Sequence, residues 1–242
     1  MGGFKLWLEP YILADTPSYG VVCKPPKMHS VPLKKTFSAE KTLLDWCAER
    51  FPEVRSVRGT LPWEGGMLHR LDYETQGLAL FAKTQRAFDA LTAQQETGRF
   101  VKEYAAAGAP AERLAGFPPD PPPPEARVIE SGFRAFGPGR QAVRPVLGSG
   151  RSYITEIRFF KAETLGRFFR LRLFRGFRHQ IRCHLAWLGF PILNDSLYGG
   201  RRDGSDILAL QAEAIAFFDP SSGAPCRYRI PNKGLEKNLR IL

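Results

Sequence analysis

The sequence predicts a protein of mixed α and β structure, in the α+β class. Short apolar runs at 21–23 and 78–82 are typical of buried strands. Segments 153–160 and 167–174 have the pattern of two strands joined in a β-hairpin. Residues 181–188 instead place apolar side chains at helical spacing. Because these signals follow one another without a second starting point, we expect residues 1–242 to form a single domain.

The N-terminal part begins with the strand at 21–23. This strand runs into Lys24-Pro25-Pro26, where the chain must turn because proline cannot continue a central strand. Residues 43–51 carry apolar side chains at helical spacing, and Pro52 predicts the end of that helix.

The middle of the chain begins with the strand at 78–82. Thr84 is expected to cap a helix that ends at Gly98, because a threonine hydroxyl accepts from the free amides of a first turn. Residues 100–106 then predict a strand, whose period of two places Lys102 and Tyr104 on one face.

The segment at about 109–150 is rich in proline and glycine, and we expect an elaborated loop within the domain. The hairpin at 153–160 and 167–174 follows it. The helix at 181–188 is then stopped by Gly189 and Pro191.

The charge of the chain favours a polyanionic partner. Its formal net charge is +11, with an isoelectric point of about 9.7. Residues 151–202 hold eleven arginines or lysines and three acidic residues, and the whole chain has 24 arginines against 11 lysines. Because the guanidinium fork binds phosphate in a bidentate way and stacks on bases, this bias favours a nucleic acid.

Several classes of protein are excluded. No apolar run is long enough to span a membrane, and the N-terminus is a poor secretory signal, so we expect no membrane association. The four cysteines are far apart in the sequence, which predicts thiols in a reducing compartment and a cytoplasmic protein. The four histidines lack the spacing of metal ligands, and there is no phosphate-binding glycine loop, so no metal or cofactor is expected.

Asp72 is the strongest candidate for chemistry. It lies between apolar residues 67–71 and the strand at 78–82, and Gly77 allows a close approach of the backbone. A carboxylate at the entrance to a buried strand is placed to act as a nucleophile or a base, although an aspartate that caps its own turn has the same position. Arg178 and Arg182 are expected to share a helical face and to supply the opposite charge.

Four blocks of the sequence carry a resemblance to a known family. Residues 69–78, His-Arg-Leu-Asp-Tyr-Glu-Thr-Gln-Gly-Leu, resemble the central motif H-R-L-D-x-x-T-S-G-L of the RluA-type RNA pseudouridine synthases. Residues 21–25 resemble the family's opening strand and K-P turn, and residues 102–104 its K-x-Y strand. Residues 176–185 resemble its G-R-x-H-Q-I-R-x-H-L block, which Asp195 and Tyr198-Gly199 close.

The resemblance implies an isomerase that converts uridine in ribosomal or transfer RNA into pseudouridine after flipping the base, without a cofactor. It implies a largely antiparallel central sheet split by a basic cleft and flanked by helices and loops. Asp72 matches the catalytic aspartate, and the sequence leaves open which atom it attacks. Tyr104 matches the tyrosine that stacks on the target base, Arg182 the basic partner of the aspartate, and Arg70 an arginine near the flipped nucleotide.

We expect RNA to be bound by the catalytic domain itself, acting as a monomer. The family often carries an N-terminal S4 domain, and the residues before Val21 are too few for one. The residues expected to bind RNA are Arg70, Lys102, Arg175, Arg178, His179 and Gln180.

The chain departs from the family pattern at Gln76, at Phe177, where the motif has Arg, and at Asn194. Two alternatives stay open. A non-catalytic RNA-binding module needs the arginines without Asp72, and a carboxylate-nucleophile phosphohydrolase needs magnesium.

Overall fold

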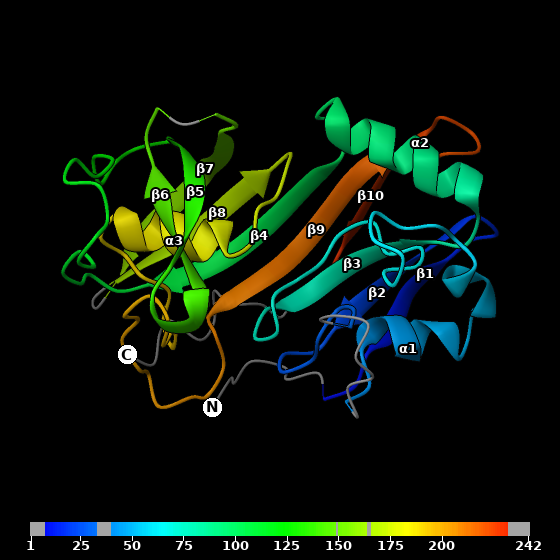
Figure 1. Ribbon diagram of the computed structural model, residues 1–242, viewed down its shortest axis with the longest axis horizontal. Coiled ribbons are helices and arrows are strands. Elements are labelled where there is room, and N and C mark those ends of the chain that lie inside the picture. The colour runs from blue at the N-terminus through cyan, green and yellow to red at the C-terminus, as the bar shows by residue number, and fades with distance from the viewer. Residues whose placement is uncertain (1–7, 33–39, 149, 164–165, 232–242) are drawn as a thin grey trace. The chain divides into compact units, whose positions relative to one another are not determined.

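The computed structural model describes residues 8–32, 40–148, 150–163 and 166–231. The chain divides into two compact units, and each has its own packing. Of the described residues, 8–102 and 212–231 belong to the first unit, and the second contains those within Glu103–Gln211. The chain leaves the first unit along β4 (Val101–Gly108) and returns along β9 (Leu210–Phe218), as Figure 1 shows.

The strands of the first unit lie in the order β1-β2-β3-β9, with β10 beside β9. The pairings β1–β2, β2–β3 and β9–β10 are antiparallel. Besides β9, these strands are β1 (Tyr11–Asp15), β2 (Tyr19–Lys24), β3 (Gln76–Ala82) and β10 (Pro225–Arg229).

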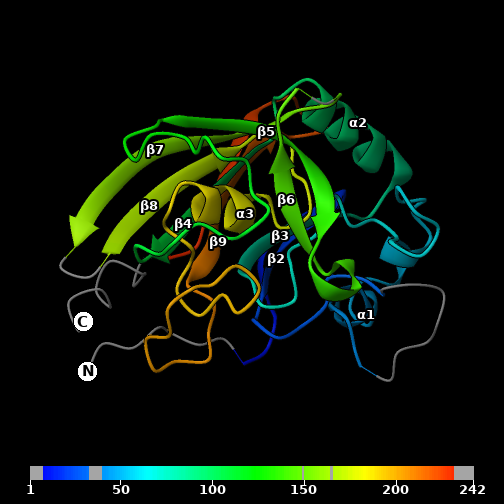
Figure 2. The same cartoon turned by 60° about the vertical axis from the view of Figure 1, so that its left-hand side comes forward.

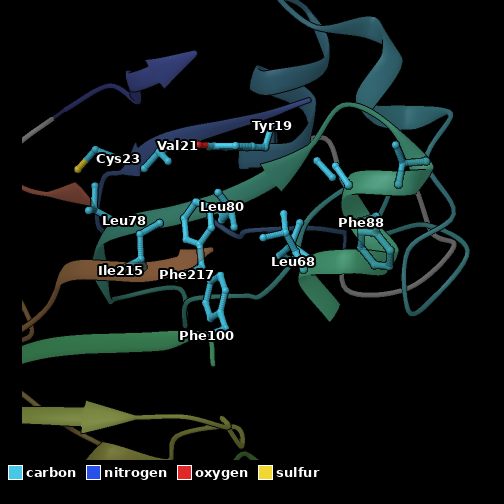
Figure 3. Close-up of a cluster of buried hydrophobic side chains, with 14 of the residues drawn as sticks. Tyr19, Val21, Cys23, Leu68, Leu78, Leu80, Phe88, Phe100, Ile215 and Phe217 are labelled. Atoms are coloured by element: carbon cyan, nitrogen blue, oxygen red, sulfur yellow. The ribbon is translucent and has the colours of Figure 1, made fainter. Parts of the chain in front are cut away.

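Apolar clusters cover both faces of β3, which explains why its sequence is a continuous apolar run. Leu78 and Leu80 belong to a cluster that includes residues of helix α2 (Gln85–Glu96) (Figure 3). Ala79 and Phe81, which alternate with them, belong to a second cluster with residues of helix α1 (Leu43–Ala48). Successive side chains of a strand point to opposite faces, so one strand supports both clusters.

The two helices of the first unit lie where the sequence predicts, although α1 ends at Ala48, before the expected end at Phe51. Thr84 caps α2 by accepting a hydrogen bond from the Ala87 amide at 3.2 Å. α1 ends before Pro52, which starts the short 3-10 helix η1 (Pro52–Arg55).

Among its described residues, the second unit contains strands in the order β4-β8-β7-β5-β6, one α-helix and one short 3-10 helix. The predicted hairpin is confirmed as the antiparallel pair β7 (Tyr153–Glu163) and β8 (Gly166–Leu173). Helix α3 (Gln180–Trp187) contacts β6 and β7 (Figure 2). All of its residues are buried.

One expectation of the sequence is wrong in the second unit. Segment 109–150 is not a loop throughout, because it contains β5 (Val128–Phe136), the 3-10 helix η2 (Pro138–Arg140) and β6 (Ala142–Val146). β5 pairs antiparallel with both β6 and β7. β6 lies at the edge of the sheet. An edge strand tolerates Pro145, although proline has no amide hydrogen to donate, and this proline is why the sequence did not predict a strand here.

The predicted α+β class with a mostly antiparallel sheet is confirmed. In the described part of the chain, no helix is long and apolar enough to span a bilayer.

Candidate functional site

Asp72 lies in a turn at the entrance to β3, in the first unit. The residues before it run antiparallel to the end of β3, where the Leu68 amide donates to the Leu80 carbonyl oxygen at 3.0 Å. The Thr75 amide donates to the Asp72 carbonyl oxygen at 3.1 Å and closes the turn. Asp72 itself is partly exposed, while hydrogen bonds hold the backbone around it.

Hydrogen bonds fix the residues on both sides of Asp72. The Ser30 hydroxyl accepts from the Leu71 amide at 3.0 Å and donates to the Leu71 carbonyl oxygen at 2.9 Å. The Met28 amide donates to the Tyr73 carbonyl oxygen at 3.2 Å. A reacting group needs such support, because a small displacement from the productive geometry is costly in rate.

Lys24 is the second support of this turn. Its fully buried Nζ donates to the carbonyl oxygens of Met28 at 2.7 Å, Pro25 at 2.9 Å and Tyr73 at 3.2 Å. Burial lowers the pKa of Lys24 to about 7, and the negative charges of Asp72 and Glu74 oppose that shift.

Gly77 follows the turn and is required by its geometry. Its φ is +126°, a region that residues with a side chain rarely adopt. A Cβ at this position would lie 2.3 Å from the Ala212 carbonyl oxygen of β9. The expected close approach of the backbone at Gly77 is thus confirmed.

His69 and Lys102 are held inside the first unit. The His69 Nε2 accepts from the Leu80 amide at 3.3 Å, which requires a neutral ring with its proton on Nδ1. Burial lowers the pKa of His69 to about 3, with a smaller effect from the Lys102 charge. Burial also lowers the pKa of Lys102 to about 8. Arg70, by contrast, is exposed and pairs with Glu64 at 3.1 Å.

Arg182 is the buried charge of the second unit, and its side chain is almost inaccessible. Its Nε donates to Asp195 Oδ2 at 2.7 Å and its Nη2 to Asp195 Oδ1 at 2.9 Å. The guanidinium also lies 5.6 Å from the centre of the Tyr198 ring. A bidentate pair of this kind offsets the cost of burying both charges and fixes the plane of the guanidinium.

Gln180 connects the start of α3 to β7. Its buried Nε2 donates to the Ile154 carbonyl oxygen at 2.9 Å and to Thr155 Oγ1 at 3.1 Å, while its Oε1 accepts from the Phe177 amide at 3.0 Å. His179, just before the helix, has a φ of +56° and its Nδ1 lies 3.4 Å from the Tyr198 hydroxyl. Both side chains are therefore engaged within the second unit.

Arg175 and Arg178 are exposed, and Tyr104 is buried on β4. The Arg178 Nη2 donates to the carbonyl oxygens of Arg140 at 2.9 Å and Ala142 at 3.1 Å. The expectation that Arg178 and Arg182 share a helical face is wrong, because α3 begins only at Gln180. The His179 backbone, in the left-handed region, separates Arg178 from the helix.

The structure divides the predicted residues between the units. Asp72, Arg70 and Lys102 belong to the first unit, and Tyr104, Arg175, Arg178, His179, Gln180 and Arg182 to the second. The sequence did not predict the role of Ser30, because no motif around it indicates that its hydroxyl bonds the backbone of Leu71. Among the described residues, no group of three or more His, Cys, Asp or Glu side chains is arranged to hold a metal ion.

Comparison with known proteins gives consistent matches. Residues 18–187 match the model of the RNA pseudouridylate synthase family. The chain is 31% identical over 205 residues to an uncharacterized RNA pseudouridine synthase of Chloroflexus aurantiacus, covering 83% of this chain and 58% of that protein. It is 33% identical over 210 residues to ribosomal large subunit pseudouridine synthase D of Xanthomonas campestris, covering 78% of this chain and 56% of that protein. The chain thus spans little more than half the length of these two relatives.

Solved structures support the same fold. Human RNA pseudouridylate synthase domain containing 1 superposes with a TM-score of 0.60 at 18% identity, over 95% of this chain and 86% of that chain. From the match over residues 18–187, which include Asp72, Tyr104 and Arg182, we conclude that the chain belongs to the RNA pseudouridylate synthase family.

Proposed function

We propose that this chain is an RNA pseudouridine synthase that isomerises uridine in ribosomal or transfer RNA, with both units acting as one catalytic domain. The observation that carries the proposal is the support of Asp72 within the matched family region. Hydrogen bonds to Leu71 and Tyr73 hold its backbone from both sides. A catalytic carboxylate needs support of this kind, because misplacing a reacting group is costly in rate.

In this proposal Asp72 is the catalytic carboxylate, Tyr104 stacks on the flipped base, and Arg182 is the basic partner of the aspartate. Asp195 supports that role, because its two hydrogen bonds fix the Arg182 guanidinium. The reaction breaks the bond between N1 and C1′ of the target uridine, rotates the base, and joins C5 to C1′. C5 then loses its proton and N1 takes one up, so that the product is an isomer of the substrate. None of the proposed roles uses a metal ion, so we expect activity in the presence of EDTA.

We assign roles to the remaining residues according to how exposed their side chains are. Arg70, Arg175 and Arg178 are exposed, which suits direct contact with RNA phosphates. Lys102 and Gln180 are buried and His179 is partly so, which favours positioning over direct contact. We expect a monomer located in the cytoplasm, in keeping with four cysteines that are free thiols.

The proposal is tested by incubating the purified protein with unmodified ribosomal and transfer RNA in separate reactions containing EDTA. Pseudouridine is then mapped by carbodiimide labelling and reverse transcription. We expect new pseudouridine in one of the two RNA pools with the wild type and none with Asp72→Ala. Absence of pseudouridine from both pools with the wild type would overturn the proposal. If Asp72→Ala kept the cellular role of the chain, a non-catalytic RNA-binding module would be favoured. A magnesium-dependent phosphatase activity would favour the carboxylate-nucleophile phosphohydrolase.

A further inference from the structure

Three aromatic rings gather at the surface of the second unit, and we propose that they form a stacking platform for an unpaired RNA base. The aromatic platform consists of Phe133 of β5, Tyr153 of β7, and Phe177, which precedes α3. This inference rests on the proposed function, because it takes RNA as the partner. It adds a base-binding position to that function.

The rings form a series that leads from the interior to the surface. His184 is fully buried, and its ring centre lies 5.0 Å from that of Phe133. Phe133 is half-buried and stacks on Phe177, with ring centres 5.0 Å apart and an angle of 9° between their planes. Phe177 is 37% exposed. The series thus ends at solvent with an aromatic ring, a surface on which a nucleobase can stack.

Phe177 is also held in place before any ligand binds. Its amide donates to Gln180 Oε1 at 3.0 Å, and its carbonyl oxygen accepts from the Gln180 amide at 3.1 Å. The Tyr153 ring contacts it at 5.0 Å between centres, at an angle of 54°. A ring fixed in this way loses little conformational freedom on binding, which favours affinity.

The charge around the aromatic platform selects the occupant. Arg175 and Arg178 flank Phe177 in the sequence and are exposed. The guanidinium of Arg151, which is also exposed, lies 5.7 Å from the centre of the Tyr153 ring. A single-stranded segment of RNA presents both a base, which can stack on the rings, and phosphates, which can pair with the arginines. An apolar protein surface would match the rings and offer the arginines no opposite charge. Phe177 stands where the similar motif has Arg, so this chain offers a ring in place of a charge.

The test compares the affinity of wild type and Phe177→Leu for two probes. The first probe is a short single-stranded oligouridylate, and the second an abasic oligomer with the same number of phosphates. We expect Phe177→Leu to bind oligouridylate about tenfold more weakly, the loss expected for one base–aromatic stack. Binding of the abasic oligomer and the salt dependence of binding should stay unchanged, because no charge is removed. Equal affinity for oligouridylate, or an equal loss on both probes, would overturn the proposal.

Two further variants keep the test sharp. Phe159→Leu is the matched control, since Phe159 is 44% exposed on the same strand as Tyr153, and we expect it to bind as the wild type does. Phe177→Trp keeps an aromatic face and should retain binding even if Phe177→Leu proves unstable in thermal melting. A loss of oligouridylate binding by Phe177→Trp equal to that of Phe177→Leu would contradict stacking.

Pseudouridine formation is measured beside binding so that the two proposals fail separately. If the wild type makes no pseudouridine while Phe177→Leu still loses oligouridylate binding, the proposed function fails and the aromatic platform stands. If the wild type makes pseudouridine and Phe177→Leu matches it in both assays, the aromatic platform fails alone.

Discussion

The Nζ of Lys24 donates a hydrogen bond to the carbonyl oxygen of Tyr73, the residue that follows Asp72, at 3.2 Å. The same ammonium bonds two further carbonyl oxygens, of Pro25 and Met28, and so joins the end of β2 to the Asp72 turn. Burying a lysine is costly unless its ammonium donates hydrogen bonds, and here Nζ donates to three backbone oxygens. We infer that Lys24 is a positioning residue for Asp72.

Lys24→Met should therefore lower kcat and leave RNA affinity unchanged. The loss of the bond to Tyr73 frees the Asp72 turn, and misplacement of a reacting group costs up to about 100-fold in rate. Single-turnover kinetics and RNA binding of the same preparation separate the two effects. Lys27→Met is the matched control, because it removes the same charge from an exposed neighbour. Equal kcat values for the two variants would contradict the positioning role.

Asp195→Ala should destabilise the second unit. It leaves Arg182 as an uncompensated buried charge, and breaking a buried pair in this way costs about 3–5 kcal/mol of the free energy of unfolding. Urea denaturation measures the change, with the exposed Asp206→Ala as control. An unfolding midpoint equal to that of the control would show that the bidentate pair contributes nothing.

The stability of the protein should fall as the pH drops below about 6.5. Burial lowers the pKa of His184 from 6.5 to about 3, so the folded protein keeps this ring neutral while the unfolded chain takes up a proton. The stabilisation is complete above pH 6.5 and is lost as the pH falls toward 3. Each such proton contributes up to about 1.4 kcal/mol per pH unit to the slope of the free energy of unfolding.

His184→Gln tests this account by removing the titrating ring from between Thr155 and Ser131. Urea unfolding of wild type and variant is measured from pH 4 to pH 7. We expect a shallower slope in the variant below pH 6.5. Parallel slopes over the whole range would exclude His184 as a source of acid sensitivity.

Local signals in the sequence predict the elements that local chemistry determines. Thr84 caps α2 and Pro52 follows α1 because capping and proline act within a few residues. The sequence did not predict β5 and β6, because Pro145 and the nearby glycines are typical of a loop. Only the position of β6 at the edge of the sheet makes a strand with a proline plausible. That position depends on pairing between distant strands, which no local pattern records.

The candidate site divides in the same way. The motif around Asp72 identified the carboxylate, and the family match covers it. The clamp of Ser30 on Leu71 joins residues 41 positions apart in the chain, and only the fold brings them together. The hydrogen bonds that Gln180 makes to β7 and to the Phe177 amide likewise depend on the fold.

The most direct test of the account is tritium release from RNA labelled at uridine C5, with EDTA present, for wild type and Asp72→Asn. The amide keeps the size of the side chain and removes its charge and nucleophilicity. We predict release by the wild type, none by Asp72→Asn, and equal RNA affinity for the two proteins. Release by Asp72→Asn at the wild-type rate would contradict the central role of the Asp72 carboxylate.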